Sequence, residues 1–287
     1  MADYSLGLYE KAMPGDLSWE QMLRCAAEGG FDALEISIDE SDGRLGRLHW
    51  DAAQRRALRN LSQDAGIPIK TMCLSGHRRF PLGSHDPAIR ERSLEILRSA
   101  VDLSGDLGIR LIQLAGYDVY YEETDEDTRK YLGDNLRKCV EYAAKQGVIL
   151  GFETMETPFM DTVTKAMDWV RQVDSPYLGV YPDIGNLQNA AVLYGTDLAS
   201  NIAAGQGHIF AAHLKETCPG IYRDMDFGTG HTNYDAAISA LWAQGVRHFT
   251  GEFWHQKGRD YKASVRAASC FLRQRIETVI AQGERHA

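Results

Sequence analysis

Four residues that can bind a divalent metal each end a short apolar segment of the sequence. They are Glu153 in VILGFE (148–153), Asp183 in LGVYPD (178–183), His213 in HIFAAH (208–213) and Glu252 in RHFTGE (247–252). A helical pattern separates each segment from the next. If the segments are parallel strands, the four side chains converge at one mouth, as metal ligands or as acid–base groups. Packing alone would not place four such groups in register.

The residue types narrow the chemistry further. Three carboxylates and one imidazole suit one divalent ion, Mn²⁺, Zn²⁺, Co²⁺ or Mg²⁺, without distinguishing among them. In an eight-stranded barrel, the strands that end at Glu153 and Glu252 are three places apart, so the two glutamates face each other across the mouth. Such a pair suits proton transfer on both faces of a substrate. The alternative for any single carboxylate is an ion pair or a helix cap, and the four together favour the metal site.

Eight strand signals, each followed by a helical pattern, must position these groups. The first four strands are predicted at 5–10, 32–37, 67–74 and 109–116, and helices at about 17–29, 51–65, 87–105, 126–146 and 262–282. Several strands are apolar at successive positions, which is typical of strands covered on both faces. The pattern predicts an α/β protein, a (β/α)8 TIM barrel in a single domain over residues 1–287. A doubly wound sheet is the alternative, but it usually has a glycine-rich turn where this chain has Tyr9-Glu10-Lys11.

The composition excludes several classes of function. The 287 residues carry a net charge of −9, which argues against nucleic acid as a partner. Five scattered cysteines without a C-x-x-C pair are typical of reduced thiols in a cytoplasm. The N-terminus has no signal-peptide pattern, and no apolar run is long enough to cross a membrane. We expect a cytoplasmic protein, assembled as a homo-oligomer, a dimer, that acts on a small molecule.

The longer motifs resemble a known family. Glu153, YPDIGN (181–186), HIFAAHLKET (208–217), RDMDFGTG (223–230) and GEFW (251–254) resemble the sugar-phosphate epimerases of the xylose isomerase-like TIM-barrel superfamily. LGLYEKAMP (6–14), MCLSGHRRFPLGS (72–84) and IQLAGYDVYY (112–121) resemble its L-ribulose-5-phosphate 3-epimerase (L-xylulose-5-phosphate 3-epimerase) group, which acts in ascorbate and L-xylulose breakdown. The resemblance implies a metal-dependent epimerase of a ketopentose 5-phosphate in which the four residues bind the metal and Glu153 and Glu252 also move the proton. One departure is the second glutamate, Glu156, in FETMETPFM.

Cationic residues near the mouth are candidates for binding a substrate phosphate. His77, Arg78 and Arg79 follow the third strand, and arginine binds phosphate in bidentate fashion. Lys215 and Arg223, beyond the seventh strand, are competing candidates, because barrels often bind phosphate in their last loops. Surface ion pairs are the alternative for the His-Arg-Arg run. Glu35, on the second strand, either orients His213 or another ligand from behind or is a solvated carboxylate.

A barrel with such residues is also compatible with other functions. An apurinic endonuclease of this fold needs more histidines at strand ends and a basic groove. A ketose 3-epimerase of unphosphorylated sugars, or a keto–aldose isomerase (a hexulose-phosphate isomerase, for example), is the closer rival, and an uncharged sugar would not need the cationic loop. A non-catalytic sugar-phosphate sensor is disfavoured because both proton-carrying glutamates are present.

Overall fold

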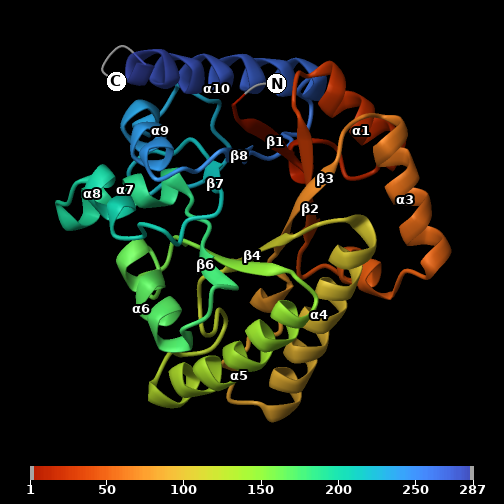
Figure 1. Cartoon of the computed structure of the whole chain (residues 1–287), viewed down its shortest axis with the longest axis vertical. Helices are drawn as coiled ribbons and strands as arrows, with labels where there is room; N and C mark the ends of the chain where they lie inside the picture. Colours follow the sequence, from red (N-terminus) through yellow and green to blue (C-terminus); the bar gives the residue numbers. More distant parts are fainter. Residues whose placement is uncertain (1–2, 285–287) are drawn as a thin grey trace.

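The computed structural model describes residues 3–284, which form a ring of parallel strands enclosed by helices (Figure 1). The strands are β1 (Ser5–Tyr9), β2 (Ala33–Ile38), β3 (Ile69–Leu74), β4 (Leu111–Ala115), β5 (Ile149–Glu153), β6 (Leu178–Val180), β7 (Ala212–Leu214) and β8 (His248–Gly251). They pair in the order β6-β5-β4-β3-β2-β1-β8-β7. Each strand therefore lies beside its neighbours in sequence, and the first lies beside the last, as in a (β/α)8 barrel.

The ring closes between β6 and the segment that leads into β7. The amide of Val180 donates to the carbonyl of His208 (2.8 Å), and the amide of His213 donates to the carbonyl of Pro182 (2.9 Å). The pairing consists of isolated bridges rather than a continuous ladder. Pro182 has no N–H, so regular pairing cannot run through it. β6 and β7 are therefore shorter than the predicted segments 178–183 and 208–213, although the predicted TIM barrel is confirmed.

The helices form the outer layer of the barrel (Figure 1). The longer ones are α1 (Trp19–Glu28), α3 (Ala52–Asp64), α4 (Pro87–Leu107), α5 (Glu126–Lys145), α6 (Val163–Val173), α7 (Ile184–Tyr194), α9 (Tyr234–Ala243) and α10 (Tyr261–Glu284). Short ones lie in the loops: α2 (Asp42–Leu45), α8 (Leu198–Ala203), η1 (Glu10–Ala12), η2 (Gly46–His49) and η3 (Gly76–Arg78). Ser18 is the N-cap of α1 and forms a capping box there. Asp86 is the N-cap of α4, which begins at Pro87. No helix among residues 3–284 has the length and apolar composition of a membrane span.

The barrel interior is polar beneath its carboxyl-terminal mouth. Because alternate residues of a strand share a face, Glu35 and Ser37 of β2 point to the same side, as do Thr71 and Cys73 of β3. Glu35 pairs in register with Thr71, and all four side chains are buried. Buried polar groups are stable only when they are hydrogen-bonded or bind a ligand. The buried polar side chains at the predicted site therefore require hydrogen-bond partners or a ligand.

We expect Gly179→Ala to destabilise the barrel because it obstructs the closure of the ring. A β carbon at Gly179 would overlap the carbonyl oxygen of His208 and the ring of Phe210. Overpacking of this kind costs roughly 1–3 kcal/mol. The matched control is Gly105→Ala in α4, where a β carbon meets nothing and helix propensity improves. Urea unfolding compares the two variants, and equal midpoints would refute this account of the closure.

Candidate active site

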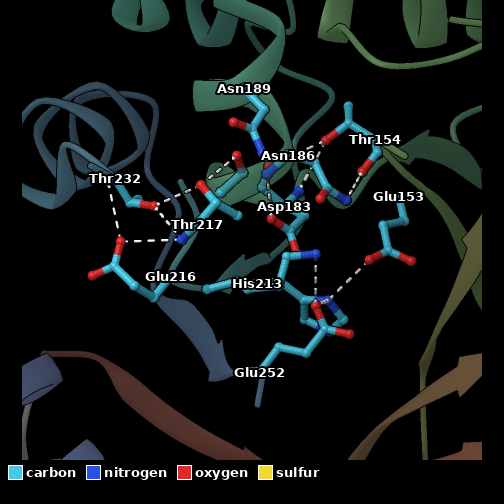
Figure 2. Close-up of polar contacts among 12 residues, drawn as sticks. Glu153, Thr154, Asp183, Asn186, Asn189, His213, Glu216, Thr217, Thr232 and Glu252 are labelled. Carbon is cyan, nitrogen blue, oxygen red and sulfur yellow. Dashed lines mark hydrogen bonds and ion pairs between the residues drawn. The ribbon is translucent and has the colours of Figure 1, made fainter. Parts of the chain in front are cut away.

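The four predicted metal ligands converge at the carboxyl-terminal mouth of the barrel (Figure 2). Each of Glu153, Asp183, His213 and Glu252 offers one ligand atom, and the four atoms lie within 4.8 Å of one another. All four residues are buried. The structure therefore brings together the residues whose spacing in the sequence predicted a common site.

The local structure explains how each side chain reaches the centre. Glu153 is the last residue of β5, and Glu252 directly follows β8, where its amide donates to the carbonyl of Leu214 (2.9 Å). His213 lies within β7 rather than at its end. Asp183 lies three residues beyond β6 and caps α7, accepting a hydrogen bond from the amide of Asn186 (2.8 Å). The strand-end placement is right for the two glutamates and approximate for the other two.

The atoms that face the centre lack hydrogen-bond partners. Within the described part of the chain, His213 Nδ1, Asp183 Oδ2 and Glu252 Oε2 are buried and have no hydrogen-bond partner apart from the ion-pair contacts of Lys215 with the two carboxylates. His213 Nδ1 lies 3.4 Å from both Glu153 Oε1 and Glu252 Oε2. An unsatisfied buried polar atom costs about 1–3 kcal/mol. A divalent cation among these atoms would satisfy them, and the set of three carboxylates and one imidazole fits such an ion.

Lys215 places a positive charge beside the same carboxylates. Its Nζ lies 2.8 Å from Asp183 Oδ2 and 3.5 Å from Glu252 Oε2. Burial opposes the charge on Lys215, but the carboxylates of Asp183 and Glu252 outweigh it and raise its pKa above the usual range. Lys215 is therefore a permanent cation that offsets part of the buried negative charge.

The two glutamates have different electrostatic environments. Burial raises the pKa of Glu153, and the nearby charge of Glu252 adds to the effect. Burial acts in the same direction on Glu252, but Lys215 and His213 outweigh it and hold the pKa of Glu252 well below its usual range. A pair of carboxyl groups whose pKa values are pushed apart suits one general acid and one general base.

Amide and hydroxyl groups support Glu153 and the segment that carries Asp183. Gln113 of β4 donates its side-chain amide to Glu153 Oε2. The hydroxyl of Thr154 accepts from the amide of Asp183 (3.0 Å), and the side chain of Asn186 donates to the carbonyl of Thr154 (2.8 Å). Figure 2 shows this set of contacts around Asp183. Gln113 thus holds the carboxylate of Glu153, whereas Thr154 and Asn186 hold the backbone that carries Asp183.

A pocket opens above the cluster. Glu153 and Glu252 are among its lining residues, and so are four cationic and three aromatic side chains. These are Lys11, Arg78, Lys215, Arg223, Tyr9, Tyr222 and Trp254. The mixture of charged groups and aromatic walls suits a small polar ligand with an anionic group.

The predicted phosphate-binding residues divide into two groups. Arg78, Lys215 and Arg223 line the pocket, whereas His77 and Arg79 do not. His77 is buried with Nε2 3.2 Å from the carbonyl of Ser93, and burial lowers its pKa to about 4, so it is neutral. Arg79 is half exposed and pairs with Asp42 (2.8 Å). Residues 76–78 form the 3₁₀ helix η3, in which successive side chains point about 120° apart, so the run cannot face one ligand together.

Comparisons with known proteins identify the family. The family model described as xylose isomerase-like TIM barrel matches residues 23–275. The L-ribulose-5-phosphate 3-epimerases UlaE of Shigella boydii and of Escherichia coli K12 are each 41% identical to this chain over 272 residues, which cover 94% of either sequence. The chain belongs to this epimerase family. It is therefore an enzyme of the isomerase class.

Solved structures of other epimerases share its fold. An L-ribulose 3-epimerase superposes with a TM-score of 0.79 at 20% identity, covering 99% of this chain and 98% of the other. A D-psicose 3-epimerase with D-tagatose from Clostridium cellulolyticum H10 superposes with a TM-score of 0.78 at 19% identity, covering 95% and 99%. At such identities the likeness shows the fold alone.

Some residues in or next to the pocket of this epimerase were not predicted as site residues. Lys11 follows the first strand and forms an ion pair with Asp39 (2.6 Å). Gln113 contacts Glu153 from β4, and Tyr222 lines the pocket next to Arg223. Lys11 had a usable signal, because it lies just after a strand, as a barrel loop residue at the mouth should. Gln113 had none, because a glutamine inside an apolar strand has no spacing that indicates its partner.

Proposed function

We propose that the chain is a metal-dependent 3-epimerase of a ketopentose 5-phosphate, L-ribulose 5-phosphate or L-xylulose 5-phosphate. One observation carries the proposal: Glu153 and Glu252 both belong to a buried metal-compatible cluster in a member of this family. The family supplies the substrate class, since the relatives are named for L-ribulose 5-phosphate.

The reaction requires two proton carriers on opposite sides of one carbon. Epimerisation at C3 of a 2-ketose removes the proton next to the carbonyl and returns one to the other face. β5 and β8 lie three places apart around the closed ring, with β6 and β7 between them. Glu153 and Glu252 thus approach a bound sugar from two sides. The difference in their pKa values allows one to accept a proton while the other donates one.

Glu153, Asp183, His213 and Glu252 would hold one divalent ion, Mn²⁺, Zn²⁺, Co²⁺ or Mg²⁺. When bound, such an ion polarises the carbonyl and stabilises the negative charge that develops as the C3 proton leaves. Lys215 adds a fixed positive charge next to Glu252 and keeps that carboxylate ionised. Trp254 and Tyr9 form one wall for the sugar, and the centres of their rings are 6.0 Å apart.

Arg78 and Arg223 are the proposed phosphate ligands, with Lys215 nearer the reacting carbons. Arg78 is mostly buried, its Nε has no hydrogen-bond partner within residues 3–284, and its guanidinium stacks 4.5 Å from the centre of the Tyr120 ring. The guanidinium of Arg223 lies 4.9 Å from the centre of the Trp254 ring. Stacked guanidinium groups keep their N–H donors free for a phosphate.

A second candidate function is 3-epimerisation of an unphosphorylated ketose, or a keto–aldose isomerisation. The acidic residues of the pocket favour it, because Asp39, Glu40 and Glu156 line the pocket together with the cations. Asp39 pairs with Lys11, and Glu40 Oε1 lies 4.0 Å from Arg78. These carboxylates offset part of the positive charge that a phosphate would require.

The proposed function predicts metal-dependent exchange at C3. Incubated in deuterium oxide with a panel of ketopentose 5-phosphates, the enzyme should incorporate deuterium at C3 and convert one epimer into the other. Prolonged chelation should abolish the exchange and leave the helical circular-dichroism signal intact, because the core does not depend on the ion. Added Mn²⁺ or Zn²⁺ should restore it. Exchange that survives complete metal removal would refute the metal-dependent mechanism.

Neutralising either proton carrier should lower turnover by at least about a hundredfold, the usual scale for a general acid or base. The variants are Glu153→Gln and Glu252→Gln, with metal content measured alongside because both residues are proposed ligands. Glu156→Gln is the comparison, since Glu156 lines the same pocket outside the four-residue cluster. It should lose less than about tenfold, below the range for a proton carrier. Near-normal turnover in a metal-loaded Glu153 or Glu252 variant removes that residue from the mechanism.

The two adjacent arginines should behave differently. Arg78→Ala should raise KM for the ketose 5-phosphate by about one to two decades, the value of a charge-assisted contact with phosphate. The same change should spare the unphosphorylated ketose. Arg79→Ala is the matched control, because Arg79 pairs with Asp42 on the surface and lies outside the pocket. A KM unchanged by Arg78→Ala assigns the phosphate to Arg223 and Lys215 or favours the unphosphorylated substrate.

A further inference from the structure

Glu35 lies behind the metal-compatible cluster and contacts one of its members directly. It is fully buried on β2, and its Oε1 is 2.6 Å from His213 Nε2. Its other oxygen, Oε2, accepts hydrogen bonds from the hydroxyls of Thr71 (2.7 Å) and Tyr181 (2.9 Å). Glu35 does not line the pocket, so the proposed chemistry gives it no direct role.

These contacts determine which nitrogen of His213 carries a proton. A carboxylate whose Oε2 already accepts two hydroxyl donors is acceptor-only, and therefore Oε1 requires a donor from the imidazole. Nε2 must supply that N–H. The other nitrogen, Nδ1, then directs its lone pair toward Glu153 Oε1 and Glu252 Oε2, each 3.4 Å away. The opposite tautomer would place a lone pair on Nε2 against the carboxylate.

We propose that Glu35 is a positioning residue that holds His213 with Nε2 protonated, so that Nδ1 is the metal-binding atom. The inference rests on the proposed function in one respect only, that the cluster binds a divalent cation. Glu35 does not touch the substrate. It acts through His213, by fixing the tautomer and the orientation of the ring.

The surroundings of Glu35 make it a rigid support. Thr71 lies on β3 in register with Glu35, and the hydroxyl of Tyr181 also contacts Thr250 Oγ1 (2.8 Å) on β8. The ring of Tyr181 lies 4.8 Å from that of His213. All of these side chains are buried. The carboxylate is therefore fixed from three sides of the barrel, and its hydrogen bond leaves the imidazole little rotational freedom.

The test compares Zn²⁺ affinity in metal-free enzyme reconstituted with Zn²⁺ alone. In Glu35→Gln, an amide oxygen turned toward Thr71 and Tyr181 leaves the NH₂ group facing His213 Nε2, which favours the wrong tautomer. The dissociation constant for Zn²⁺ should rise about 10–100-fold, the usual loss for such a partner of a metal ligand. The matched control is Asp118→Asn, another buried carboxylate that accepts hydroxyl donors, Thr124 and Thr128, outside the pocket. Its Zn²⁺ affinity should be unchanged.

A measurement on the unaltered enzyme keeps the inference testable if Glu35→Gln does not fold. In Zn²⁺-loaded enzyme labelled with ¹⁵N-histidine, the His213 Nε2 resonance should show a directly bonded proton and Nδ1 the shift of a metal-bound nitrogen. A proton on Nδ1, or a Glu35→Gln variant that binds Zn²⁺ as tightly as the parent, overturns the inference. If the parent binds no divalent cation, the inference and the metal-dependent function fail together. Tight Zn²⁺ binding without C3 exchange refutes only the function.

Discussion

The structure around the mouth of this barrel depends on compensating the negative charge of several buried carboxyl groups. Three carboxyl groups and an imidazole lie within 4.8 Å of one another inside the barrel, with Glu35 directly behind them. Isolated charges are strongly disfavoured in such surroundings unless they are paired or bind a metal. Lys215 forms an ion pair with Asp183 at the mouth, and Gln113 donates a hydrogen bond to Glu153 from β4. Buried atoms without a hydrogen-bond partner remain in the same cluster, where a divalent cation would complete the charge balance.

The same constraint divides the structure into two functional layers. The helices and the outward faces of the strands bury apolar side chains and carry the stability of the barrel. The inner face near the mouth is polar, and the hydroxyl of Thr71 on β3, for example, donates to the carboxylate of Glu35 on the neighbouring strand β2. A barrel suits this arrangement because parallel strands deliver side chains from all sides to one point at their carboxyl ends. The network around Glu35 shows that the positioning extends below the residues that reach the pocket.

Hydrophobic periodicity and the residues at the ends of the strands made much of the fold and of the site predictable from the sequence. The eight units, the barrel and the four clustered residues follow from short apolar runs that each end in a potential ligand, and the structure confirms the barrel and the cluster. The sequence did not show which residues of the His77-Arg78-Arg79 run face the pocket. Their adjacency does not reveal that a 3₁₀ turn directs the three side chains apart. The contacts of Gln113 and Lys11 depend on tertiary geometry that spacing does not encode. The single domain, the dimer, the cytoplasmic location and the phosphate site stay predictions.

The closure of the ring has a consequence for how a cation and the fold depend on each other. β6 and β7 meet at isolated bridges, and Asp183 and His213 lie on opposite sides of that seam. An ion held by both residues is a cross-link between the two edges of the sheet, in the place where backbone pairing is least continuous. A cation that binds the folded state alone would stabilise it by mass action, more strongly the further its concentration exceeds the dissociation constant, and would so strengthen the seam. Local opening at the seam and release of such an ion would then be a single event, which would tie the working life of the catalyst to the supply of metal.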